Sequence, residues 1–368
     1  MAVQVLTPRV SVLLSVHNGG SYLKDAVESV LCQTYRDFEF LILDDGSTDG
    51  SVDYLDCVVK QDSRVRVIRQ QNRGLVASLN RLIAESCGSL LARMDADDIC
   101  TPDRLQLQVD QFDLDPDLAV LGGRIERIDS SGKSLGEQGY PLTARESEDM
   151  LWFGCPVAHP AVMMRRDVVM ELGGYRDFFT HCEDYDLWLR ISQRASIRNL
   201  EQVVLRYRVH QGSVSGSNRS EQLLGTYLAQ VAWLMRRRGE PDPVHQWEKP
   251  SLELLESLRL PTEEECLFRA RWTLAVVSAL DHSDRDRVSE YLRKFPTIPP
   301  ALRQQGRSIK IRLYKELTLR AWRCREFLQA FRWGLVLANL MAAFHLREFV
   351  DRAIRRRSSS EHSFHSHE

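Results

Sequence analysis

The 368-residue sequence lacks the features that mark several large classes of protein. It has no uninterrupted apolar run of the roughly 18 residues that a membrane-spanning helix needs, and the best candidate, residues 333–344, is too short. No basic segment followed by an apolar run stands at the start, so the sequence predicts no signal peptide. The eight cysteines form no CxxC pair and no zinc-finger spacing, which favours reduced core thiols in a reducing compartment.

The sequence also lacks a large net charge, because its formal charge is −2. This small net charge predicts no nucleic-acid partner for the chain as a whole. Residues 307–357 differ from the rest, with thirteen Lys and Arg against four Asp and Glu, a net charge of +9. This segment either packs as helices on the rest of the chain or lies as a basic amphipathic segment on an anionic membrane surface. The predicted location is cytoplasmic, with peripheral contact at the inner face of the membrane under the second interpretation.

Short apolar runs alternate with helical patterns along the first 220 residues, as in a parallel sheet with helices on its faces. The predicted fold class is α/β, with a mostly parallel central sheet in residues 1–220. A helical C-terminal region over 221–357 and a disordered tail over 358–368 follow. The first predicted strands are residues 10–16, 38–43, 65–68 and 90–94. Polar loops follow three of them, and we expect these loops to gather at the carboxyl edge of the sheet.

Three carboxylates, Asp95, Asp97 and Asp98, follow the buried strand at 90–94. Like charges this close repel each other, and a divalent cation such as Mg²⁺ or Mn²⁺ would remove the conflict. In extended chain Asp95 and Asp97 point to the same side, so both can face one ion. The alternative is a helix cap by Asp97 or Asp98, and Asp98 is the residue that fits this alternative best.

The second acidic loop, residues 44–49, also follows a strand. Asp45 can accept a hydrogen bond from a planar base. The alternative is that Ser47 or Thr48 caps the next helix.

A third acidic pair, Glu183 and Asp184, begins a predicted helix over 183–191. Acidic residues stabilise a helix N-terminus without any further function. The other interpretation is a general base that takes the proton of an acceptor hydroxyl. His210, at the end of a predicted strand, is a candidate metal ligand, and His159 is a weaker one; a buried structural histidine is the alternative for both.

Together these motifs resemble those of an inverting family 2 glycosyltransferase of GT-A fold, over about residues 8–215. The pieces occur in the following order: Ser15-Val16-His17-Asn18, Gln33-Thr34-Tyr35, Asp44-Asp45-Gly46-Ser47-Thr48-Asp49, Asn72-Arg73-Gly74 with Asn80, Asp95-Ala96-Asp97-Asp98, Pro102 with Arg104, His159, and Glu183-Asp184-Tyr185-Asp186-Leu187-Trp188.

The resemblance implies a GT-A nucleotide-sugar-binding fold and a role for each matched residue. Asp184 would be the general base, supported by Glu183. Asp95 and Asp97 would form the DxD pair that contacts the ribose and the metal. The remaining nucleotide-sugar contacts would be Ser15, His17, Asn18, Asp45, Arg73 and Asn80. Family members usually carry Pro and Tyr where this chain has Ser15 and His17, which leaves the choice of nucleotide open.

The implied reaction is transfer of a sugar from a nucleotide sugar, with a UDP-sugar favoured, to a hydroxyl of a glycan or lipid-linked acceptor. It would use Mn²⁺ or Mg²⁺. Two other functions stay open: a nucleotide-sugar-binding module without turnover, and a metal-dependent nucleotidyltransferase. No GxxxxGK[ST] phosphate-binding motif supports the latter, and the presence of Asp97 and Asp184 argues against the former.

Overall fold

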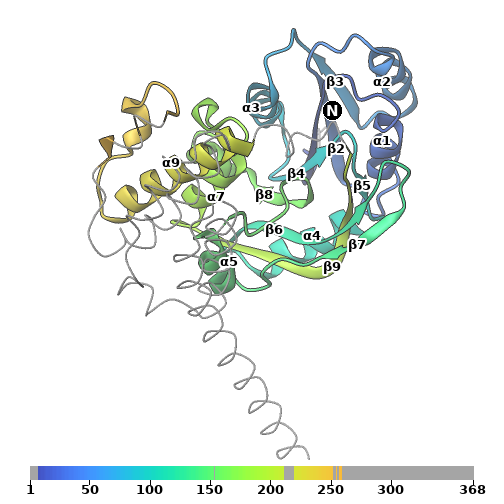
Figure 1. Ribbon diagram of the computed structural model, residues 1–368. Helices are drawn as coiled ribbons and strands as arrows, with labels where there is room; N and C mark the ends of the chain where they lie inside the picture. The colour runs from blue at the N-terminus through green and yellow to red at the C-terminus, as the bar shows by residue number, and fades with distance from the viewer. Residues whose placement is uncertain (1–6, 153, 211–218, 252–253, 255–256, 259–368) are drawn as a thin grey trace, which may run out of the picture. The chain divides into compact units, whose positions relative to one another are not determined.

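A computed structural model describes residues 7–152, 154–210, 219–251, 254, 257 and 258 (Figure 1). The chain divides into two compact units after Pro250, and every helix and strand named below lies in the first. Most of the predicted helical region over 221–357, the basic segment 307–357 and the predicted tail over 358–368 lie outside the described residues. Within the described part, no helix combines the length and apolar character needed to cross a membrane.

The first half of the compact unit alternates strands and helices, as the sequence predicts. In chain order its elements are β1 (Val10–Val16), α1 (Leu23–Leu31), β2 (Phe38–Asp44), α2 (Ser51–Gln61), β3 (Val65–Arg69), α3 (Leu75–Glu85) and β4 (Leu90–Asp95). The second half is more irregular. Its elements are β5 (Ile99–Cys100), α4 (Arg104–Leu114), β6 (Leu118–Ile128), β7 (Ser134–Gln138), α5 (Ala144–Leu151), η1 (His159–Ala161), β8 (Met163–Arg165), α6 (Arg166–Glu171), η2 (Asp177–Phe179), α7 (Glu183–Ile191), β9 (Ser196–Arg208), α9 (Arg219–Arg237) and η3 (Pro243–Gln246).

The strands form one mixed sheet in the order β3-β2-β1-β4-β8-β6-β9-β5, with β7 added beside β6. The block from β3 to β4 is parallel, and the long strands β6 and β9 are also parallel to each other. The short strand β8 runs antiparallel between these two parallel parts. In the register of β1 with β4, Ser15 lies beside Asp95, so the polar loops after these strands meet at one edge, as predicted.

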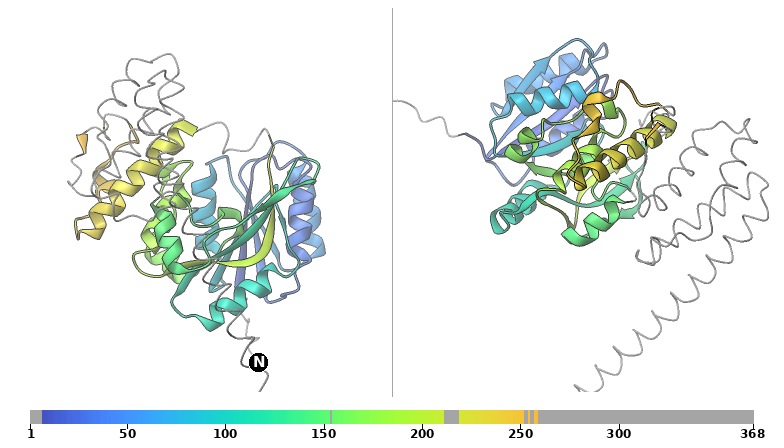
Figure 2. Two further views of the ribbon diagram at one scale, coloured as in Figure 1. Left: turned by 60° about the horizontal axis from the view of Figure 1, so that its bottom comes forward. Right: turned by 90° about the vertical axis from the view of Figure 1, so that its left-hand side faces the viewer.

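The two faces of the parallel block are covered by different helices (Figures 1 and 2). Alternate residues such as Val12 and Leu14 of β1 and Ala92 and Met94 of β4 pack in one large core with side chains of α1, α2 and α4. Strand side chains alternate between faces, so Arg93 and Asp95 belong to the opposite face, where α3 lies against β1 and β2. The end of β4 thus presents Asp95 on the α3 side of the sheet.

Two interpretations of the sequence were wrong. Cys32, Cys57 and Cys87 are exposed, so they are not core thiols. Ser47 and Thr48 do not cap a helix, because α2 begins later with Gly50 at its N-cap; the Ser47 hydroxyl instead accepts a hydrogen bond from the main-chain N–H of Asn18.

Gly88 fixes the pairing of β1 with β4 by a close approach of main chain to main chain. A Cβ atom at Gly88 would lie 2.6 Å from the main-chain nitrogen of Ser11 and 2.7 Å from the carbonyl carbon of Val10. Gly50 is a matched control, because a Cβ there would meet no atom within 4 Å.

We expect Gly88→Ala to lower the free energy of unfolding by about 1–3 kcal/mol, because two backbone segments must separate. Gly50→Ala should change it by less than about 1 kcal/mol. Urea unfolding followed by circular dichroism measures both. Equal effects of the two substitutions would contradict the close approach.

Candidate active site

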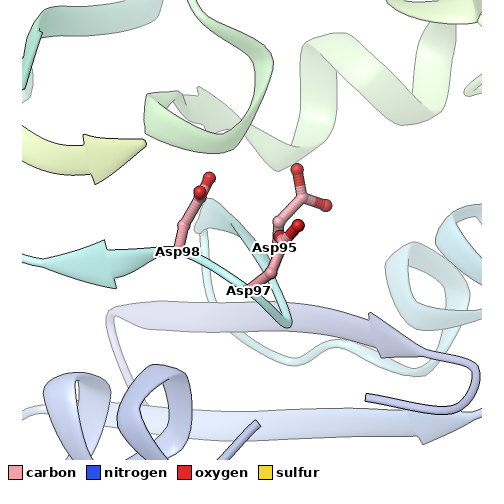
Figure 3. Close-up of side chains that lie close together, drawn as sticks. All are labelled: Asp95, Asp97 and Asp98. Carbon is pink, nitrogen blue, oxygen red and sulfur yellow. The ribbon is translucent and has the colours of Figure 1, made fainter. Parts of the chain in front are cut away.

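The carboxylates of Asp95, Asp97 and Asp98 come together where β4 turns towards β5 (Figure 3). One oxygen of each lies within 4.8 Å of one oxygen of the other two. Asp98 is 1% exposed, whereas the side chains of Asp95 and Asp97 are 30% and 34% exposed. The cluster is therefore buried on one side and open to solvent on the other.

The electrostatics of this cluster are unfavourable without a counterion. Burial, and then the neighbouring carboxylates of Asp95 and Asp97, raise the pKa of Asp98 well above its usual value. Burial is also the main cause that raises the pKa of Asp95. The Oδ2 atom of Asp98 is buried and has no hydrogen-bond partner among the described residues. A hard divalent cation fits this set of oxygen donors, because it would neutralise the charge and give Oδ2 a ligand to bind.

The Nε2 atom of His210, the predicted metal ligand, lies 2.9 Å from Oδ2 of Asp97, beside the cluster. The expected helix cap by Asp97 or Asp98 is not found. Helix α4 begins after Asp103, and no side chain caps it. The Oδ1 atom of Asp98 instead accepts a hydrogen bond of 2.8 Å from the main-chain N–H of Arg208. Asp98 therefore belongs to the cluster, and its assignment as a cap was wrong.

Arg93 is a site residue that the sequence analysis missed. Its side chain is 4% exposed, and its Nη1 lies 2.6 Å from Oδ2 of Asp95. The sequence feature that could have identified it is its position as a single charged residue inside the apolar run Leu90–Met94. This buried guanidinium partly offsets the negative charge of the cluster and fixes the orientation of the Asp95 carboxylate.

Glu183 and Asp184 begin α7, and no side chain caps this helix. Glu183 is 6% exposed, and burial together with the adjacent Asp184 raises its pKa to about 7. Burial also raises the pKa of Asp184, whose Oδ2 atom accepts a hydrogen bond of 3.4 Å from the thiol of Cys155. Both carboxyl groups are therefore stronger bases than ordinary surface carboxylates.

One cavity of about 700 Å³ joins the two acidic groups. Asp95, Asp97, Glu183 and Asp184 all line it, together with Arg73. The other lining residues come from α3, β4, η1, η2, β9 and α9 and from the segments beside them: Gly74, Leu75, Val76, Arg93, His159, Pro160, Asp177, Thr180, His181, Tyr207 and Gln222. Five of these residues belong to no sequence motif that could have predicted them: Asp177, Thr180, His181, Tyr207 and Gln222.

Asp45 organises the loop beside this cavity. It is 3% exposed and accepts hydrogen bonds from the side chain of Gln70 and from the main-chain N–H groups of Arg73 and Gly74, at 2.8–2.9 Å. The Nδ1 atom of His17 donates to the main-chain carbonyl of Asp45 at 3.0 Å. Asn18 accepts a hydrogen bond from the main-chain N–H of Thr48. The structure thus gathers three of the predicted nucleotide contacts, His17, Asn18 and Asp45, into one loop cluster.

Like Ser15, His17, Asn18 and Asp45, Asn80 does not line the cavity. Its side-chain amide donates to the carbonyl of Tyr175 and accepts from the N–H of Tyr175, both at 2.8 Å. This pair of bonds ties α3 to the segment before η2. The Nε2 atom of His159 lies 2.8 Å from the hydroxyl of Tyr175, and burial lowers the pKa of His159 well below its usual value, so His159 is neutral.

The raised pKa of Glu183 predicts a pH-dependent stability. A carboxyl group whose pKa is higher in the folded state than in the unfolded state stabilises the fold when protonated, and this contribution is lost as the pH rises towards 7. The full pKa change from 4.5 to about 7 corresponds to roughly 3 kcal/mol.

Relative to Glu183→Gln, we therefore expect the wild type to lose about 2 kcal/mol of unfolding free energy between about pH 5 and about pH 7. Urea unfolding across this range in the absence of divalent cations measures the difference. Glu171→Gln, at an exposed position, serves as the control. A difference between wild type and Glu183→Gln that does not vary with pH would show that Glu183 is ionised throughout.

Comparison with known proteins identifies the family of this chain. Residues 11–173 match the family model of glycosyl transferase family 2. The chain is 34% identical over 212 residues to the O-antigen biosynthesis glycosyltransferase WbnJ of Escherichia coli, a match that covers 56% of this chain and 82% of WbnJ.

Two solved structures share the fold at low sequence identity. S. aureus TarS 1-349 superposes with a TM-score of 0.51 at 14% identity, covering 88% of this chain and 89% of that one. The mannosyltransferase PcManGT from Pyrobaculum calidifontis, solved in complex with GDP-Man and Mn²⁺, superposes with a TM-score of 0.50 at 15% identity, covering 91% and 88%. The chain belongs to glycosyltransferase family 2 and has the GT-A fold of these enzymes.

Proposed function

We propose that the protein transfers a sugar from a nucleotide sugar to an acceptor hydroxyl by a single displacement with inversion, assisted by a divalent cation. The donor we favour is a UDP-sugar, and the acceptor is a glycan or a lipid-linked sugar. The observation that carries this proposal is the shared cavity, which places the Asp95–Asp97 carboxylates and the Glu183–Asp184 carboxylates around one volume of about 700 Å³. Such a cavity is large enough for a sugar nucleotide and the reacting end of an acceptor.

On the donor side, Asp97, Asp98 and His210 are the residues that would hold Mn²⁺ or Mg²⁺. The bound cation would stabilise the negative charge that develops on the leaving diphosphate. Asp95, held by Arg93, is our assignment for the ribose. The Mn²⁺ in the PcManGT complex supports the choice of metal.

Ser15 and the loop cluster of His17, Asn18 and Asp45 are our assignment for the base, with Arg73 on the lining of the cavity. Ser15 is level with Asp95 in the sheet, and Asp45 is hydrogen-bonded to the main chain of Arg73. The base pocket and the carboxylate cluster would therefore be continuous along the carboxyl edge of β1, β2 and β4.

On the acceptor side, Asp184 takes the proton of the attacking hydroxyl. The hydroxyl oxygen forms the new bond to the anomeric carbon while the bond from that carbon to the diphosphate oxygen breaks, so the configuration inverts. Burial raises the pKa of Asp184, which brings its basicity closer to that suited to proton transfer near neutral pH. With its pKa raised to about 7, Glu183 is partly protonated near neutral pH, which limits the repulsion between the two adjacent carboxyl groups.

The lining of the cavity supports a sugar as the acceptor. Thr180, His181 and Gln222 line the same cavity as Asp184, and all three side chains can exchange hydrogen bonds with sugar hydroxyls. Asp177 also lines it. The O-antigen function in the name of WbnJ supports a role in polysaccharide synthesis.

Release of the nucleoside diphosphate from a panel of nucleotide sugars, with Mn²⁺ or with EDTA, tests the function. We expect slow Mn²⁺-dependent release of UDP from one UDP-sugar, with water as the acceptor. Binding of UDP in calorimetry without any release would indicate a binding module. Release of pyrophosphate from a nucleoside triphosphate and a sugar phosphate would indicate a nucleotidyltransferase.

The substitution Asp184→Asn tests the assignment of Asp184 as the general base. Loss of the proton acceptor should reduce turnover by about 10²–10⁴-fold, while the affinity for UDP with Mn²⁺ in calorimetry stays within about twofold. Asp149→Asn, an identical chemical change at an exposed position on α5, should leave both unchanged. Turnover of Asp184→Asn close to that of the wild type would overturn the assignment.

A further inference from the structure

Arg208, the last residue of β9, connects the predicted cation site to two other parts of the fold. It is 3% exposed. Its main-chain N–H donates to Oδ1 of Asp98, and its Nε donates to the main-chain carbonyl of Asp97, both at 2.8 Å. Two consecutive residues of the carboxylate cluster are therefore bonded to one arginine that lies 110 positions later in the chain.

The same guanidinium reaches the turn after β6 and the start of α1. Its Nη1 donates to the carbonyls of Asp129 and Ser130 at 3.3 Å. Its central carbon lies 4.4 Å from the centre of the Tyr22 ring, and its Nη2 lies 3.7 Å from Oδ2 of Asp25. Five planar donors in a fixed fork suit this arrangement, and a lysine could not reproduce it.

Tyr22 extends the connection to the candidate ligand His210. The centres of the Tyr22 and His210 rings lie 5.3 Å apart with the planes tilted by 37°. His210 in turn approaches Asp97. Tyr22 is thus packed between the guanidinium of Arg208 and the imidazole of His210, and it begins the helix that follows the His17–Gly20 loop.

We propose that Arg208 and Tyr22 are positioning residues of the cation site. Arg208 fixes the main chain that carries Asp97 and Asp98, and Tyr22 fixes the ring of His210, so the mutually repelling carboxylates are held in a binding arrangement before the cation arrives. Neither residue contacts the cation. Groups that orient metal ligands commonly change metal affinity by about 10–100-fold when they are removed. The inference rests on the proposed cation site.

Arg206 provides a matched control on the same strand. It lies two residues before Arg208, and its guanidinium contacts Glu126 at 2.9 Å and the carbonyl of Gly132 at 2.8 Å. These partners lie outside the carboxylate cluster. Arg206→Lys therefore removes a guanidinium from the same strand without touching the contacts of the cluster, although Arg206 is 37% exposed and Arg208 is 3% exposed.

The test is the affinity of the full chain for Mn²⁺ without nucleotide, measured by electron paramagnetic resonance of free Mn²⁺, together with thermal unfolding in EDTA. We expect Arg208→Lys to weaken Mn²⁺ binding by about tenfold or more and Arg206→Lys to leave it unchanged. Tyr22→Leu should weaken binding several-fold, and Tyr22→Phe should retain the wild-type affinity because the ring is kept.

Three results would overturn the inference. Arg208→Lys and Tyr22→Leu could lower the melting temperature in EDTA and leave the Mn²⁺ affinity unchanged, which would make both residues purely structural. Arg206→Lys could weaken binding as much as Arg208→Lys. Absence of Mn²⁺ binding by the wild type would instead remove the cation site of the proposed function, and the inference with it. If Arg208→Lys does not fold, the comparison of the Mn²⁺ affinities of Tyr22→Leu and Tyr22→Phe tests the inference.

Discussion

Mutual repulsion among the carboxyl groups of Asp95, Asp97 and Asp98 is the constraint on which this site depends. Burial of Asp98 makes the repulsion costly, because a low-dielectric surrounding strengthens it and removes the hydration of the charges. The buried guanidinium of Arg93 is paired with the Asp95 carboxylate, whereas the buried guanidinium of Arg208 bonds to the main-chain carbonyl of Asp97 and not to its carboxylate. The charges of Asp97 and Asp98 remain uncompensated by that pair, and a divalent cation is the group that best completes the balance.

The mixed sheet explains why the acidic groups meet. The parallel strands β1, β2 and β4 end at the same edge, so their loops gather there. The long strand β9 pairs with β6 and with β5, and its last residue reaches the turn that carries Asp97 and Asp98. Helix α7 then brings Glu183 and Asp184 to the cavity that Asp95 and Asp97 also line. In the proposed reaction, the first pair would activate the acceptor and the second would serve the leaving group.

Much of this arrangement was predictable from local sequence, and the parts that were not depend on contacts between distant residues. Apolar runs predicted β1 to β4, and strand order predicted that Asp45 and Asp95 would share an edge. Asn80 was assigned to the nucleotide, yet its amide is used by Tyr175, 95 residues later. The sequence position of Asp98 suited a helix cap, but in the fold its carboxylate accepts a hydrogen bond from the main-chain N–H of Arg208. Arg93 was not predicted because its place in the site depends on which face of β4 meets the cavity. Residue spacing does not show which face that is.

The most direct test of the central claim is thermal unfolding of the wild type and of Asp98→Asn, each in EDTA and in a series of Mn²⁺ concentrations. If the cluster is a cation site, Asp98→Asn should be as stable as the wild type or more stable in EDTA, because one repelling charge is removed. Mn²⁺ should then stabilise the wild type by about 2.7 kcal/mol at a concentration one hundred times the Kd, and the variant by much less. No Mn²⁺-dependent stabilisation of the wild type, or an equal stabilisation of both proteins, would contradict the account.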